Sequence, residues 1–207
     1  MTDSNTAAAA AADYCRLLAA CFYQPDPAFV EERVFDAMAT AGRALGAAFE
    51  QDAMALGQSF AVDDLQALLV DYTRLFIGPA HTLASPFEAT WAGRGGASPQ
   101  APILALYAEG GFEVADDFQN LPDHVAAQLE FLYLLLFRQA QALQVGDIDT
   151  LPRWEALEHR LLRQHLGAWF APFAAAIRDG AETLYFRRLA DAAERFVESR
   201  AGRVGGG

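Results

Sequence analysis

Asp123 and His124 are the residues of this chain whose types fit acid/base chemistry, because a carboxylate can orient an imidazole that accepts a proton. They stand at the start of a strongly apolar segment that is expected to be helical. Neighbours in sequence do not face each other on a helix. Asp123 is instead predicted to share a face with Glu130, and His124 to face Gln128 and Phe131. The spacing therefore offers no assembled catalytic pair.

A structural role for the same residues is the alternative. Asn120 can cap the predicted helix, and Pro122 suits its first turn, where the missing N–H group has no partner to lose. Asp123 would then complement the positive end of the helix dipole. Local physics favours this reading over an acid/base pair.

Other catalytic and metal-binding patterns are absent from the sequence: it has no GxSxG, no HExxH and no GxGxxG after a strand. His81, His159 and His165 show no ligand spacing. All 15 basic residues are arginine, which excludes a Walker-type or Schiff-base lysine. Cys15 and Cys21 lie about 120° apart on a helix and are predicted to be buried thiols. We expect no catalytic residue, no metal and no cofactor.

The net charge points to the class of partner. The chain carries 27 acidic against 15 basic residues, a formal charge of −12, which disfavours nucleic-acid binding and suits a cationic partner. The alternative is that the acidity only keeps the protein soluble. The most apolar stretch, 129–137, is too short to cross a bilayer, and residues 1–12 lack a basic targeting region. We therefore expect a cytoplasmic protein without membrane insertion.

Proline and glycine divide the chain into segments with helical apolar stripes, and no alternating run bounded by hairpin turns is present. The sequence predicts an all-α fold, a helical bundle of about eight to ten helices. Asp63 and Gln66 have capping-box spacing at the start of a helix that ends at Gly78-Pro79. The other predicted helices are 7–23, two within 29–60, 101–109, 122–144, 151–166, 168–179 and 181–201.

The stretch 78–100 is predicted to be a long ordered loop or hinge, because it contains Phe87 and Trp91 among its glycines and prolines. It suggests an N-terminal helical lobe at 1–92, a hinge at 93–100 and a C-terminal helical lobe at 101–201, followed by a disordered tail at 202–207. A hinge of this length would allow the C-terminal half to be exchanged between protomers. We therefore expect a monomer or a domain-swapped homodimer.

Two motifs resemble the signature of the TorD/DmsD family of cytoplasmic chaperones for molybdoenzymes, and the similarity extends from about Asp13 to Glu198. Gln128 stands where the family usually has glutamate. The residues that match in order and spacing are Tyr72, Leu75, Phe76, Gly78, Pro79, Pro86, Glu88 and Trp91 in the first motif, and Pro122, Asp123, His124, Val125, Leu129 and Leu132 in the second.

The resemblance implies a protein that binds the twin-arginine signal peptide of a molybdopterin-containing oxidoreductase and delays export of the apoenzyme until its cofactor is inserted. Our hypothesis places Leu75, Phe76 and Trp91 in the apolar part of a peptide groove and Asp123 and His124 at its polar end. The full set of expected peptide-binding residues is Tyr72, Leu75, Phe76, Pro86, Trp91, Pro122, Asp123 and His124. The alternatives are a helical adaptor that binds no signal peptide, and a His-Asp hydrolase or nucleotide-binding protein.

Overall fold

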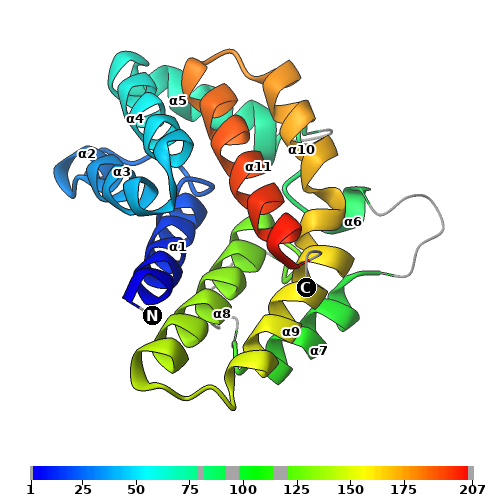
Figure 1. Cartoon of the computed structure of the whole chain (residues 1–207). Coiled ribbons are helices and arrows are strands. Elements are labelled where there is room, and N and C mark those ends of the chain that lie inside the picture. Colours follow the sequence, from blue (N-terminus) through cyan, green and yellow to red (C-terminus); the bar gives the residue numbers. More distant parts are fainter. Residues whose placement is uncertain (1, 79–81, 92–97, 114–120, 205–207) are drawn as a thin grey trace.

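The structure is a computed structural model that describes residues 2–78, 82–91, 98–113 and 121–204 (Figure 1). Within these ranges the chain is helical and forms no named strand, so the predicted all-α fold is confirmed. The elements are α1 (Thr2–Ala20), α2 (Ala28–Glu31), α3 (Val34–Leu45), α4 (Ala47–Val62), α5 (Leu65–Tyr72), a π-helical turn η1 (Thr73–Ile77), α6 (Glu88–Trp91), α7 (Gln100–Gly110), α8 (Val125–Val145), α9 (Leu151–Gln164), α10 (Leu166–Gly180) and α11 (Leu184–Val204).

Helix α1 is central to the packing, because it lies beside both α3 and α8 (Figure 1). Its residue Tyr14 is fully buried, and the ring stacks on Phe196 of α11 with centroids 5.3 Å apart. The Cys15 thiol donates a hydrogen bond to the Leu129 carbonyl of α8. One apolar core therefore draws on both halves of the chain.

The two-lobe division stays a prediction. Residues 93–97 of the predicted hinge lie outside the described ranges, and Gln100 already begins α7. Helix α11 continues to Val204, into the segment predicted as a tail, and residues 205–207 lie outside the described ranges.

Both cysteines are buried free thiols, as predicted. Burial raises the pKa of both, that of Cys21 to about 12. They therefore remain protonated packing residues at neutral pH.

The start of α11 is held by carboxylates from a distant part of the chain. Asp71 of α5 is 1% exposed, and its Oδ2 accepts hydrogen bonds from the Glu182 N–H, the Thr183 N–H and the Thr183 hydroxyl at 2.8–3.0 Å. Asp63 accepts from the Tyr185 N–H at 2.9 Å. The predicted capping box of Asp63 is therefore wrong: its side chain caps α11 and not its own helix, which begins at Leu65 with no side-chain cap.

The π-helical turn η1 directly continues α5. The Gly78 N–H bonds to the Thr73 carbonyl, five residues back, instead of the usual four. The carbonyls of Arg74 and Leu75 accept hydrogen bonds from the N–H groups of residues 83 and 84. The first part of the long loop is thereby fastened to the end of the helix that carries Tyr72.

Candidate functional site

The two motif segments lie side by side in the structure. The Val125 N–H donates to the Pro86 carbonyl at 2.8 Å, and the Glu88 N–H donates to the Asp123 carbonyl at 3.1 Å. Between these bonds Phe87 and His124 form an antiparallel bridge. Residues 86–88 are thus paired with residues 123–125.

Asp123 lies before α8 and not on one of its faces, which corrects the prediction that it shares a face with Glu130. Its side chain is completely buried, and its Oδ2 accepts a hydrogen bond from the Ala89 N–H at 3.0 Å. No described residue donates a hydrogen bond to its Oδ1. A buried acceptor without a donor is uncommon in folded proteins and calls for an explanation.

His124 is the N-cap of α8, which begins at Val125 and not at Pro122 as predicted. Its Nδ1 accepts a hydrogen bond from the Ala126 N–H at 3.1 Å. Burial lowers the pKa of His124 to about 4, so the ring is neutral at pH 7. Since Nδ1 is occupied by the cap, the structure favours the structural role over acid/base chemistry. Asn120, the predicted cap, lies outside the described residues.

A buried polar network joins the first motif to α8 and α10. The Glu88 carboxylate is 6% exposed and accepts a hydrogen bond from Gln128 Nε2 at 2.8 Å. His165 Nδ1 lies 3.1 and 3.2 Å from the two Glu88 oxygens. Trp169 Nε1 donates to Gln128 Oε1 at 3.3 Å. These side chains hold the short helix α6 against α10, which lies next to it in Figure 1.

Sequence reasoning missed this network. His165 was set aside because it shows no ligand spacing, and its partner Glu88 is 77 residues away in the sequence. The sequence did contain one signal for the network, because Gln128 stands where the family usually has glutamate. Unlike a carboxylate, an amide side chain can donate a hydrogen bond to one carboxylate and accept another from an indole at the same time.

The aromatic residues of the first motif form a row of ring contacts. Tyr72 packs on Phe76 at 5.3 Å, Phe76 on Phe173 at 6.2 Å, and Phe173 on Trp91 at 6.2 Å between centroids. The ends of the row, Tyr72 and Trp91, are half-buried. Leu75 and Phe76 are buried in the core, so in this structure they are not open to a peptide, and of the predicted apolar groove residues only Trp91 is partly accessible.

The two prolines of the expected site differ in exposure. Pro86 is buried and contributes its carbonyl to the pairing with α8, whereas Pro122 is half-buried and its carbonyl accepts a hydrogen bond from the Tyr107 hydroxyl at 2.9 Å. Both therefore shape the backbone of the paired segments.

Three carboxylates surround Tyr107 close to the paired segments. Burial raises the pKa of the Tyr107 phenol, and the negative charges of Glu88, Asp123 and Glu130 raise it further. Within the described residues no arginine forms an ion pair with any of the three. Only His165 lies next to one of them, Glu88. Among residues 2–78, 82–91, 98–113 and 121–204, these three carboxylates thus have no arginine partner.

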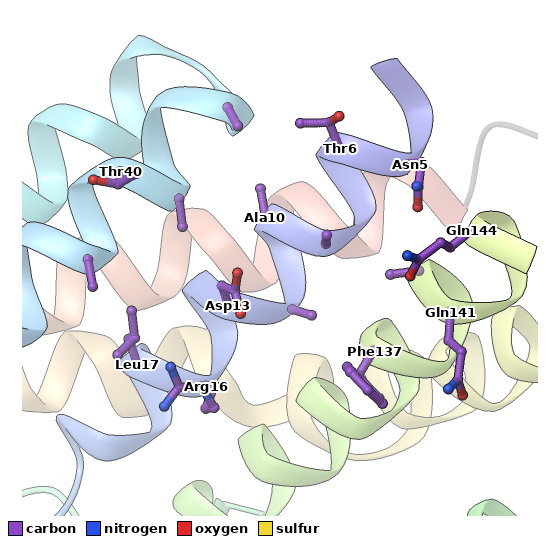
Figure 2. Close-up of a pocket in the computed structure, with 16 residues that line it drawn as sticks. Asn5, Thr6, Ala10, Asp13, Arg16, Leu17, Thr40, Phe137, Gln141 and Gln144 are labelled. Carbon is purple, nitrogen blue, oxygen red and sulfur yellow. The ribbon is translucent and has the colours of Figure 1, made fainter. Parts of the chain in front are cut away.

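A separate groove of about 810 Å³ lies over α1, between α3 and α8. Figure 2 shows Asp13 and Arg16 on α1, with Thr40 of α3 on one side and Phe137 of α8 on the other. The remaining lining is largely alanine and polar side chains without charge. The charges of Asp13 and Arg16 cancel, so the lining of this groove has no net charge that would attract a cationic peptide.

Two classes of site find no support in the described part of the chain. No group of three or more His, Cys, Asp or Glu side chains there is placed to hold a metal ion. No helix there is both long and apolar enough to span a bilayer.

Comparison with known proteins adds to this geometry. Residues 36–175 match the family model described as nitrate reductase delta subunit. The chain is 29% identical over 137 residues to the perchlorate reductase assembly chaperone protein of Dechloromonas aromatica (strain RCB), an alignment that covers 62% of this chain and 59% of that relative.

A solved structure shares the fold. It is the crystal structure of a proposed redox enzyme maturation protein from Archaeoglobus fulgidus, with a TM-score of 0.57 and 19% identity, and the match covers 90% of this chain and 93% of the other.

Proposed function

Because this chain belongs to the nitrate reductase delta subunit family, we propose that it is a maturation chaperone that binds the twin-arginine signal peptide of a molybdopterin-containing oxidoreductase. The family membership confirms the resemblance to TorD/DmsD chaperones found in the sequence. The relative from Dechloromonas aromatica is named for assembly and not for catalysis, which agrees with a protein that is not an enzyme. By this proposal it acts in the cytoplasm and holds the apoenzyme back from export until its cofactor is inserted.

One observation carries the proposal: the paired motif segments combine half-buried aromatic rings with carboxylates that form no ion pair with any described arginine. A twin-arginine signal peptide combines two guanidinium groups with an apolar run. Guanidinium groups bind carboxylates through short, often bidentate, hydrogen bonds. The apolar run requires apolar surface, which the half-buried rings of Tyr72 and Trp91 can supply, whereas Leu75 and Phe76 are buried.

The remaining expected site residues have supporting roles in this proposal. Pro86 and Pro122 fix the backbone of the paired segments, and His124 fixes the start of α8. Asp123 contributes negative charge from beneath the surface. A variant of any of these four residues would alter the site by displacing its backbone as well as by removing a contact.

Calorimetric titration with synthetic signal peptides tests the proposal. Each peptide is paired with a version in which both arginines are replaced by glutamine. Trp91→Ala should weaken binding of the diarginine peptide by about tenfold, because it removes a half-buried aromatic surface. Trp154→Ala is the matched control, since Trp154 is a half-buried tryptophan of α9 outside the motif segments. Absence of heat with every peptide, from a folded protein, would refute the proposal.

The oligomeric state follows as a second measurement. We expect a monomer or a dimer that exchanges C-terminal halves, and light scattering during gel filtration would distinguish the two. A dimer with 1:1 peptide stoichiometry per protomer would show that exchange leaves the site complete.

A further inference from the structure

The geometry points to Glu130, held by the Tyr23 hydroxyl, as the receptor for one arginine guanidinium of the peptide. This inference rests on the proposed function and identifies the accessible carboxylate of the same site. Neither residue belongs to the set expected from the sequence motifs. Asp123, which does, is completely buried.

The Glu130 side chain is half-buried on α8, one turn and a half beyond its start. Its Oε1 accepts a hydrogen bond from the Tyr23 hydroxyl at 2.6 Å, and Oε2 makes no hydrogen bond with any described residue. A carboxylate has about four acceptor positions, so most of the capacity of Glu130 is unused. The tyrosine restricts the rotation of the carboxylate and thereby preorganises the acceptor.

Several carboxylates of the protein already hold an arginine, and Glu130 does not. Asp52, Glu109, Glu158 and Glu194 each form an ion pair with an arginine, whereas Glu130 forms none within the described part of the chain. No described arginine would therefore have to be displaced from Glu130 by one that a partner brings.

A second observation, independent of Glu130, also indicates a cationic or donor ligand. Among the described residues, the buried Asp123 Oδ1 accepts no hydrogen bond. Asp123 lies two residues before α8, the helix that carries Glu130, so the unpartnered acceptor and Glu130 stand towards the same end of that helix.

Aromatic rings complete the receptor. Tyr23 and Tyr72 are both half-buried, and Tyr72 lies near enough to contribute to the raised pKa of Tyr23, after burial and Glu130. A guanidinium stacks favourably on such rings, whereas an ammonium is more strongly hydrated. From Tyr72 the ring contacts continue through the buried Phe76 and Phe173 to Trp91, so Tyr72 and Trp91 are the rings of this row that apolar residues after an arginine at Glu130 could contact.

The test is a cycle of protein and peptide substitutions measured by calorimetry at low salt. The proteins are the wild type, Glu130→Gln and Glu155→Gln, the last being an exposed carboxylate of α9 that controls for net charge. The peptides carry two arginines, two lysines or two glutamines. Wild type should prefer the diarginine peptide, and Glu130→Gln should reduce that preference by about tenfold, as expected for a hydrogen bond to a charged group. Glu155→Gln should leave it unchanged, and the dilysine peptide should bind between the other two.

The possible results distinguish a failure of the proposed peptide binding from a failure of the receptor role of Glu130. If wild type binds no peptide, or binds the diglutamine peptide equally well, the proposed function fails and this inference fails with it. If wild type discriminates but Glu130→Gln discriminates equally well, or weakens all three peptides alike, only the receptor role is overturned. Should Glu130→Gln not fold, Glu130→Asp decides instead: it keeps the charge but withdraws it by one methylene, and undiminished discrimination would overturn the inference.

Discussion

Removal of the Asp71 carboxylate should be among the most destabilising single changes in the chain, because it strands donors that have no other acceptor among the described residues. Asp71 Oδ2 accepts the Glu182 N–H, the Thr183 N–H and the Thr183 hydroxyl, and Oδ1 accepts from Arg74 at 3.0 Å. Both Asp71 and Thr183 are buried. Arg74 also pairs with the Glu182 carboxylate at 2.9 Å, so it keeps a partner in the variant.

The magnitude follows from the two donors of Thr183. Hydrogen bonds to a charged group contribute about 1.5 to 3 kcal/mol each, so Asp71→Ala should lower the free energy of unfolding by about 3 to 6 kcal/mol. With a urea slope of about 2 to 3 kcal/mol/M, the unfolding midpoint should fall by about 1 to 3 M. Asp71→Asn keeps one acceptor and should cost roughly half as much. Circular dichroism at 222 nm during urea titration measures each value.

Asp63→Ala is the matched control, because Asp63 supports the same end of α11 through a single backbone hydrogen bond. It should cost about 1 kcal/mol, the usual effect of losing one helix cap. If Asp71→Ala costs no more than Asp63→Ala, water replaces the carboxylate freely and the reasoning from stranded donors is refuted.

Two further predictions concern His124 and Gly167. Burial lowers the pKa of His124 to about 4 from 6.5, so the native state should lose up to about 3 kcal/mol of stability as the pH falls from 6.5 to 4. His124→Asn keeps a capping side chain and should flatten this pH dependence of the unfolding free energy, measured by urea titration at each pH. The same pH dependence in the variant and the wild type would contradict the prediction. Gly167→Ala places a Cβ against the Leu162 carbonyl and should cost more than about 2 kcal/mol by thermal melting. Gly202→Ala, where a Cβ meets nothing, should be neutral or stabilising.

Local features of the sequence predicted the helices well. The helix predicted at 7–23 corresponds to α1, and Cys15 and Cys21, predicted as buried thiols, are both completely buried. Glycine and proline marked the boundaries, because their backbone preferences act within a few residues. The predicted start of α8 at residue 122 was wrong because His124 caps the helix with its side chain while its own backbone is extended, so the helix starts three residues later, at Val125.

Long-range polar contacts could not be predicted in the same way. Asp71 accepts hydrogen bonds from Thr183, 112 residues away, and Glu88 pairs with His165, 77 residues away. No spacing rule connects such positions, because the tertiary fold alone brings them together. Tyr23 and Glu130, 107 residues apart, belong to the same class, and this explains why motif matching did not single them out.

Burial also decides which variants can reveal a binding site. Asp123→Ala would strand the Ala89 N–H and loosen the pairing of the two motif segments, so lost peptide binding in that variant would have two explanations. Glu130→Gln strands no buried donor, because an amide oxygen can still accept from Tyr23. Its effect on binding should therefore depend on whether the peptide carries arginine, while its unfolding midpoint stays near that of the wild type. The buried motif residues thus stabilise the backbone of the site, whereas the half-buried Glu130 is the residue whose charge a bound peptide would contact.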